Sequence, residues 1–320
     1  MMTQDLMRPE SGREVLTSLA AVPPEAEWFA NLDNPRTRRA YEQDIQDFMT
    51  CIGIARPEAF RLVTRAHVLF WRKDLESRKL AKASIRRKLS ALSSLFDYLC
   101  ECHAVTHNPV DGVKRPKVGS QEGLTPALNA AQARVLLEAP DPTTLKGQRD
   151  RAMLATFLYH GLRESELCGL KVKDTRQQRE GIAHLRIHGK GDKIRFVPIA
   201  PKAQRLIHEY LAAAGHSDDL NGALFRPVRN HRTGVLNKAL APEAVLRIVK
   251  AYGQTTGISA QVHGFCVHSL RATAATNALE HDADLAKVQQ WLGHANIATT
   301  RLYDRRHLKA EDSPTFKVVY

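Results

Sequence analysis

Apolar side chains recur at intervals of three and four residues through most of this chain, and this helical period restricts its fold more than any other feature. In the stretch TRRAYEQDIQDFMTCIG, four apolar side chains share one helix face: Tyr41, Ile45, Phe48 and Ile52. The period continues in HVLFWRKDLESRKL and in ASIRRKLSALSSLFDYLCECH, and Asn108-Pro109 ends it. Residues 31–115 are therefore expected to form an all-helical unit.

Only one stretch alternates with the period of a β-strand. The segment AHLRIHGKGDKIRFVPI, residues 183–199, alternates on both sides of a Gly-Lys-Gly-Asp turn. This pattern predicts a β-hairpin with Lys190 at its tip. Helical patterns return after the hairpin and run to about residue 306. The expected fold class is therefore mainly α with a small β-sheet (α+β).

The length of 320 residues is enough for two domains with separate cores. Residues 1–30 show little period, so they are expected to form a flexible N-terminal arm. The segment 116–126 belongs to a stretch rich in Gly, Pro and Lys and predicts a basic linker. The second helical unit then spans 127–306. The tail 307–320 ends in the apolar stretch TFKVVY, and it is expected either to fold back or to dock on a neighbouring protomer.

The charge of the chain favours a polyanionic partner. There are 47 Lys and Arg against 34 Asp and Glu, a net charge of +13. Between Arg61 and Lys88 there are ten basic residues and only two acids, Asp74 and Glu76. Such a face is either ordinary solvated surface or a contact for the DNA backbone. Five side chains are our candidates for DNA contact: Arg86, Arg87, Lys114, Arg115 and Lys117.

Several function classes are not supported by the sequence. No apolar run approaches the roughly 20 residues of a membrane span, and the start MMTQDLMRPESGREVL is too polar for a signal peptide. The five cysteines are scattered and give neither a disulfide framework nor a metal-ligand pattern: Cys51, Cys100, Cys102, Cys168 and Cys266. We therefore expect a protein of the reducing cytoplasm, associated with the nucleoid, without a membrane partner, metal or cofactor.

Six polar side chains of the second unit are candidates for catalysis: Arg163, Lys190, His268, Arg271, His294 and Tyr303. Taken singly, each has an ordinary explanation, such as a helix cap or a surface charge. As a set they suit transesterification of a phosphodiester. Guanidinium groups can fork onto phosphate oxygens, and a phenol can attack phosphorus. A lysine can protonate the departing 5′-oxygen, histidines can move protons, and no metal is needed.

Four stretches of the second unit resemble the catalytic domain of the tyrosine recombinases, the family of phage integrases and Xer-type resolvases. They are GLRESELCGL, HGKGDKIRFVPI, HSLRATAATNAL and WLGHANIATTRLYDRR, in the order found in the family. Together they span roughly residues 150–306. The basic helical first unit resembles the core-binding domain of the family, by layout more than by motif.

The resemblance implies a role for each matching residue. Arg163 and Arg271 would bind the scissile phosphate, and Tyr303 would be the nucleophile. Lys190 would be the general acid for the 5′-hydroxyl. Lys193 is a rival for this role, but it lies past the turn of the hairpin.

The resemblance also implies supporting residues. His268 and His294 would assist by hydrogen bonding and proton transfer, and Glu166 would brace an arginine or a histidine. Two positions depart from the pattern of the family. His160 stands where Thr is frequent, and Ala272 where His or Arg is commoner. Neither departure removes a catalytic group.

The implied function is site-specific DNA recombination through a 3′-phosphotyrosyl intermediate and a Holliday junction. The implied assembly is a homo-tetramer on two double-stranded DNA sites, with or without accessory DNA-bending proteins. Two alternatives stay open: a type IB topoisomerase, and a non-catalytic DNA-binding regulator on the same scaffold. The sequence leaves open the target site and the choice between integration, excision and multimer resolution.

Overall fold

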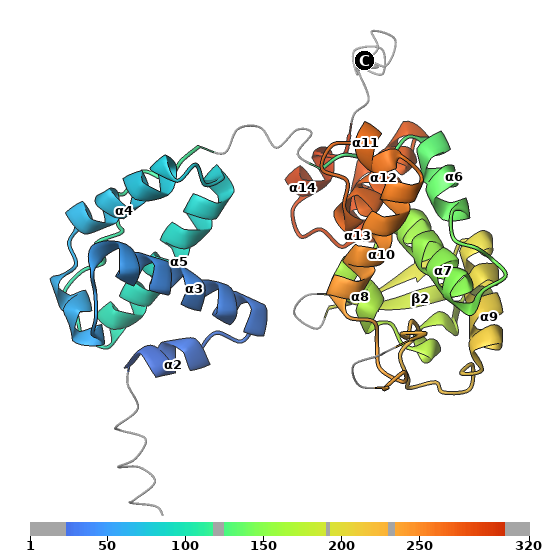
Figure 1. The fold of residues 1–320 in the computed structure, drawn as a ribbon, viewed down its shortest axis with the longest axis horizontal. Helices are drawn as coiled ribbons and strands as arrows, with labels where there is room; N and C mark the ends of the chain where they lie inside the picture. The colour runs from blue at the N-terminus through green and yellow to red at the C-terminus, as the bar shows by residue number, and fades with distance from the viewer. Residues whose placement is uncertain (1–23, 118–124, 190–192, 230–233, 305–320) are drawn as a thin grey trace, which may run out of the picture. The chain divides into compact units, whose positions relative to one another are not determined.

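The computed structural model describes residues 24–117, 125–189, 193–229 and 234–304 (Figure 1). The chain divides into two compact units, Met1–Ser120 and Gln121–Tyr320. The boundary falls inside the basic stretch 116–126. Each unit is described by itself below.

The described part of the first unit is helical. Its elements, in chain order, are α2 (Pro24–Ala30), α3 (Pro35–Ile52), the 3-10 helix η1 (Pro57–Leu62), α4 (Arg65–Ser77) and α5 (Lys82–Glu101). The start of α3 shows why helices begin where they do. The Asn34 side chain accepts hydrogen bonds from the backbone N–H groups of Arg36 and Thr37, and Pro35 occupies the first turn, where no N–H is needed.

The predicted apolar faces of α3, α4 and α5 form the core of the first unit, with Phe48 and Trp71 in edge-to-face contact. The prediction that residues 1–30 form a flexible arm is wrong for the last seven of them, Pro24–Ala30. These form α2, and its Trp28 is buried and donates its indole N–H to Ser94. Pro24 is the first residue of α2, a position that tolerates proline. Residues 1–23 lie outside the described part of the chain.

The second unit contains most of the elements. They are α6 (Ala130–Glu138), α7 (Leu145–His160), α8 (Glu164–Gly169), η2 (Val172–Thr175), β1 (Gln177–Arg179), β2 (Ile182–His188), β3 (Ile194–Pro198), α9 (Pro201–Ala214), α10 (Pro242–Thr255), α11 (Ile258–Gln261), α12 (Val267–Glu280), α13 (Leu285–Leu292) and α14 (Ile297–Arg301). Helix α7 is buried along most of its length, because α6, α9 and α12 pack against it. Figure 1 shows α7 between α9 and α12.

The three strands form one antiparallel sheet in the order β1-β2-β3. The predicted hairpin is present, and its register pairs Leu185 with Val197 and His188 with Ile194. Strand β1 was not predicted, because its sequence, Gln-Gln-Arg, carries no apolar alternation. The mainly helical fold with a small sheet is confirmed.

Candidate active site

One wall of the candidate site is the turn between α7 and α8. Helix α7 ends at Gly161, whose φ of +59° is left-handed. A Cβ atom at this position would lie 2.7 Å from Cδ2 of Leu292. Glycine is therefore suited both to the backbone angle and to the close approach of α13. The turn places Arg163 at the N-cap of α8.

Glu166 lies at the centre of the site and is buried. Its Oε1 accepts from Nη1 of Arg163 at 2.8 Å, and its Oε2 accepts from the Arg163 backbone N–H at 2.8 Å. Arg195, on β3, donates from both Nη atoms to the same carboxylate, each at 2.8 Å. Burial alone raises the pKa of Glu166, but the bonds and charges of Arg195 and Arg163 outweigh it and hold the pKa at about 2. Glu166 is thus ionised at neutral pH.

Arg271 projects from α12 into the same cluster, with 1% of its surface exposed. Its Nη1 donates to the Gly161 carbonyl at 2.5 Å, and its Nη2 donates to the Leu292 carbonyl at 2.8 Å. Burial, followed by the charge of Arg163, lowers the pKa of Arg271 to about 10. The guanidinium is therefore still positively charged at neutral pH.

Tyr303 follows α14 in a turn and is buried, with 6% of its surface exposed. Its Oη lies 3.1 Å from Nε2 of His268, on the first turn of α12. Burial raises the pKa of Tyr303, and the positive charges of Arg271 and Arg163 act against this rise. Partial burial and the same two arginines lower the pKa of His268. A neutral imidazole thus stands beside the phenol and can accept its proton.

His294 also lies beside the phenol of Tyr303. It follows Gly293, the left-handed residue that ends α13. Its ring is stacked near that of Tyr303, with centroids 5.9 Å apart, and its Nδ1 lies 2.8 Å from Oγ1 of Thr300. Burial, followed by the charges of Arg271 and Arg163, lowers the pKa of His294 to about 4. Its ring is therefore neutral at physiological pH.

The structure thus brings together Arg163, Glu166, Arg271, Tyr303 and the two histidines from four separate segments. Lys190 lies outside the described residues. The hairpin that carries it is anchored beside the site, since its Arg195 binds Glu166. Lys193 is exposed just before β3, and its carbonyl accepts from the Gly189 N–H at 2.7 Å.

The described residues offer neither a metal-ligand cluster nor a membrane span. Within these ranges, no group of three or more His, Cys, Asp or Glu side chains is placed to hold a metal ion. The helices found there are also too short or too polar to cross a membrane.

Comparison with known protein families identifies the family of this chain. Residues 126–310 match the phage integrase family, and residues 33–102 match the N-terminal SAM-like domain of phage integrases. The first match alone covers more than half of the chain. The chain belongs to the phage integrase family of tyrosine recombinases. It is therefore an enzyme of the site-specific recombinase class.

Curated relatives of this recombinase extend over most of its length. Tyrosine recombinase XerC of Herpetosiphon aurantiacus is 34% identical over 268 residues, which are 83% of each chain. XerC of Pelobacter propionicus is 33% identical over 87% of this chain and 91% of its own. Tyrosine recombinase XerD of Listeria monocytogenes is 30% identical over 83% of this chain and 86% of its own.

Solved structures share the fold of this recombinase. The post-cleavage complex of XerH with palindromic difH has a TM-score of 0.67 at 22% identity, over 83% of this chain and 75% of the XerH chain. A lambda integrase tetramer bound to a Holliday junction has a TM-score of 0.64 at 18% identity, over 96% of this chain and 84% of the integrase chain. At these identities the likeness shows the fold alone.

The basic residues predicted to contact DNA fall into two groups in the first unit of the recombinase. All five are exposed. Arg87 and Arg115 are in addition hydrogen-bonded within the unit. Arg115 donates to Ser90 at 2.8 Å, and Arg87 forms an ion pair with the buried Asp44.

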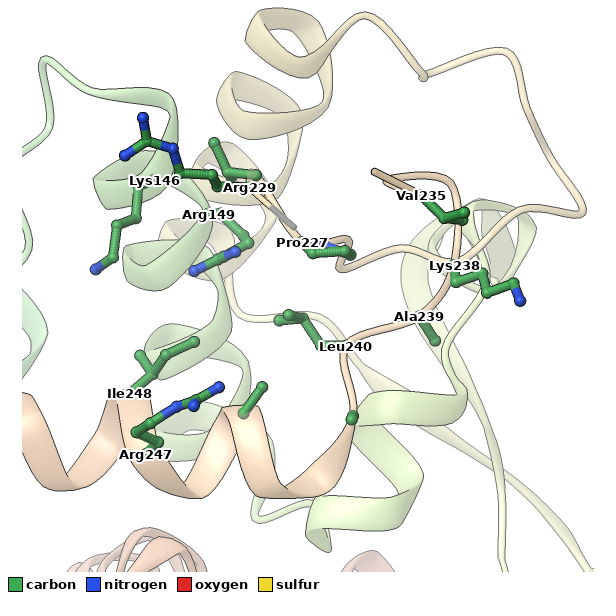
Figure 2. Close-up of a pocket in the computed structure, with 13 residues that line it drawn as sticks. Lys146, Arg149, Pro227, Arg229, Val235, Lys238, Ala239, Leu240, Arg247 and Ile248 are labelled. Carbon is green, nitrogen blue, oxygen red and sulfur yellow. The ribbon is translucent and has the colours of Figure 1, made fainter. Parts of the chain in front are cut away.

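The second unit of the recombinase also has a basic pocket, and none of the described candidate catalytic residues lines it. This pocket of about 980 Å³ lies between the start of α7, the start of α10 and the segments 227–229 and 235–241 (Figure 2). Five cationic side chains line it: Lys146, Arg149, Arg229, Lys238 and Arg247. None of the described lining residues is acidic, although Asp150, which is itself buried, binds Lys146 and Arg149. The sequence did not predict this group, because its members lie far apart in the chain.

The sequence also did not predict two residues that contact the candidate site, Arg195 and Thr300. Arg195 was seen only as part of an alternating strand, and its partner Glu166 is 29 residues away in the chain. Thr300 lay within a quoted motif, but nothing in the local sequence pairs it with His294.

Proposed function

We propose that this recombinase cleaves and rejoins DNA by transesterification, with Tyr303 as the nucleophile. The observation that carries the proposal is the hydrogen bond of 3.1 Å between Tyr303 Oη and His268 Nε2, next to the cationic side chains of Arg163 and Arg271. A phenol held beside a neutral base and two guanidinium groups is arranged to attack an anionic phosphodiester.

The attack exchanges one phosphate ester for another. Tyr303 Oη forms a bond to phosphorus, its proton passes to Nε2 of His268, and the bond between phosphorus and the 5′-oxygen breaks. The product is a 3′-phosphotyrosyl ester, and its reversal by another 5′-hydroxyl rejoins the strand. Because phosphoryl exchange conserves the ester bond, no external energy source is required.

Charge on the non-bridging oxygens is proposed to be stabilised by Arg163, Arg271 and His294. The Arg163 side chain has 36% of its surface exposed, so a phosphate oxygen can reach its guanidinium. The departing 5′-oxygen takes a proton from the hairpin lysine, Lys190, with Lys193 as the alternative donor.

The assembly proposed here follows the family. Residues 31–115 serve as the core-binding domain and residues 127–306 as the catalytic domain, on a duplex carrying a specific recombination site. Four protomers join two sites and exchange strands through a Holliday junction, with accessory DNA-bending proteins where the site requires them, in the nucleoid. Its structural relatives include XerH bound to difH and a lambda integrase tetramer on a Holliday junction, which supports this proposal.

Covalent capture tests the proposal even though the target site has not been identified. The purified protein is incubated with sheared genomic DNA from its source organism, and protein–DNA adducts that survive detergent are sequenced. Wild-type protein should enrich a fragment with inverted repeats, and Tyr303→Phe should bind that fragment without forming an adduct. An adduct formed by Tyr303→Phe would show that another residue is the nucleophile.

Two further outcomes would favour the alternatives. A type IB topoisomerase would relax any supercoiled plasmid, whereas the recombinase should act only on plasmids that carry the captured site. A non-catalytic regulator would form no adduct, even on nicked DNA, but would still retain specific genomic fragments by non-covalent binding.

A further inference from the structure

Three arginines converge on the C-terminal end of α13, the helix that precedes His294. The carbonyls of Trp291, Leu292 and Gly293 accept, in order, from Nε of Arg195 at 3.1 Å, Nη2 of Arg271 at 2.8 Å and Nη2 of Arg163 at 3.2 Å. Carbonyls at a helix C-terminus lack partners within the helix and carry partial negative charge. Here each of three successive carbonyls is paired with a different guanidinium.

The same three arginines surround one carboxylate, that of Glu166. Arg163 and Arg195 donate to it directly, and Nη1 of Arg271 lies 4.0 Å from Oε2. Glu166 is therefore the shared counter-ion of three cations that come from α8, β3 and α12. If its charge or position were lost, the three guanidinium groups would repel one another in a poorly hydrated site.

Arg195 differs from the other two arginines in how its donors are used. Its Nε, Nη1 and Nη2 are all bonded, two of them to Glu166 in a parallel fork and one to Trp291. Its guanidinium also packs against the α-carbon of Gly293, where an added Cβ would lie 3.2 Å from Nη1. Its donors are thus engaged by protein groups, which suits holding the site more than binding a phosphate.

We propose that Arg195 is a positioning residue of this active site: it clamps Glu166 and the end of α13, and so holds Arg163, Arg271 and His294 in one arrangement. This inference rests on the proposed cleavage chemistry. Lysine cannot replace the clamp, because an ammonium group cannot form the parallel fork and reach Trp291 at the same time.

The chain offers a matched control on the same hairpin. Arg186, on β2, binds the buried Asp174 from both Nε and Nη2, each at 2.8 Å, outside the catalytic cluster. Arg186→Gln therefore breaks a comparable Arg–carboxylate pair and measures the structural cost alone. Arg195→Gln, Arg195→Lys and Arg186→Gln would be compared by covalent cleavage of the captured site on nicked suicide DNA, with DNA affinity measured in parallel.

We expect Arg195→Gln to slow single-turnover cleavage by about 100-fold, the cost typical of a displaced catalytic group, while site affinity stays unchanged. Arg186→Gln should cleave at a rate close to that of the wild type. In the double variant Glu166→Gln/Arg195→Gln, cleavage should be no slower than in the slower single variant, because Arg195 acts through Glu166. Independent, multiplicative losses would contradict the clamp.

The pH profile separates positioning from a general loss of structure. Among the described residues, the charged groups facing Glu166 are Arg163, Arg195 and Arg271. Without Arg195, the pKa of Glu166 should rise from its value of about 2. Cleavage by Arg195→Gln should then fall as the pH is lowered from about 7 to 5, whereas Arg195→Lys should be slow but keep the wild-type profile. An Arg195→Gln enzyme with the rate and pH profile of Arg186→Gln would overturn the inference. A wild-type protein that formed no adduct would instead refute the proposed function.

Discussion

Two lysines in the sequence between β2 and β3, Lys190 and Lys193, are candidates for the same role, and the chemistry of the leaving group distinguishes them. Lys190→Ala should cleave normal DNA slowly, because the 5′-oxygen leaves poorly without a proton. A 5′-bridging phosphorothiolate leaves as a thiolate and needs no proton, so it should restore cleavage by Lys190→Ala. Single-turnover assays with both substrates measure this rescue.

Lys193→Ala is the matched control for that experiment. Lys193 is exposed just before β3, with its carbonyl bonded to Gly189. Rescue restricted to Lys193→Ala would transfer the role of general acid from Lys190 to Lys193.

At the residue scale, the sequence predicted which groups share the site but not how they are held. Tyr303, His268 and the arginines were found because the chemistry of a phosphodiester requires such groups in one pocket. The partners of Arg195 were not predictable, because Glu166 and Trp291 lie 29 and 96 residues away from it in the chain. Local spacing says nothing about such distant contacts.

The end of α7 makes a testable contribution at the scale of secondary-structure elements. Gly161→Ala places a Cβ at a positive φ and against Leu292, on the residue whose carbonyl binds Arg271. We expect the free energy of unfolding to fall by more than the about 1–2 kcal/mol of a left-handed alanine, and cleavage to slow at least tenfold. Urea unfolding and single-turnover cleavage measure the two effects.

Gly215→Ala is the control for Gly161→Ala, because it measures the cost of a positive φ without a steric clash. Gly215 ends α9 with a φ of +64°, and a Cβ there would meet no atom within 4 Å. This variant should lose only about 1–2 kcal/mol and keep the wild-type cleavage rate. Equal effects of the two substitutions would mean that the approach of Leu292 to Gly161 is unimportant.

Helices with a clear apolar face were predicted well, and elements that depend on distant contacts were not. The apolar positions Ile45, Phe48, Ile85 and Leu92 do lie in the core of the first unit. Strand β1 is three polar residues long, and it exists because β2 offers it an edge. Helix α2 is similar, since Trp28 and Phe29 pack on the core and Tyr98 of α5 donates a hydrogen bond to Glu27.

On α5, adjacent arginines should differ in their contribution to DNA binding. Both are exposed, but Arg87 is also paired with Asp44, which is 1% exposed and lies 3.2 Å from Lys88. Arg86→Gln should reduce the slope of log affinity for DNA against log salt concentration by about one, and it should leave the stability of the protein unchanged. Arg87→Gln should lower stability, because the buried Asp44 loses a partner. Salt titrations of affinity and thermal unfolding would test both; a destabilised Arg86→Gln or a neutral Arg87→Gln would contradict this division.

At the scale of the whole molecule, charge and assembly are the relevant properties. A net charge of +13 suits a protein that follows a phosphate backbone, and the basic pocket beside α10 adds cations in the second unit. Charge attracts DNA without regard to sequence, and therefore it cannot by itself assemble the proposed tetramer. Assembly requires contacts between protomers, and the sequence offers one candidate for them in the tail.

The tail 307–320 lies outside the described residues, and our prediction for it rests on its sequence. Its end, TFKVVY, is apolar enough to favour burial, either on its own domain or on a neighbouring protomer. A head-to-tail contact repeated around a ring closes on itself, so docking on a neighbour would couple all four sites of a tetramer. Deletion of residues 313–320 should then leave binding of one protomer to a half-site nearly unchanged. It should reduce cooperative filling of the full site and the pairing of two sites, as measured by gel shifts on half and full sites. An unchanged ratio of singly to doubly bound DNA, with recombination intact, would leave the tail with a packing role within its own chain.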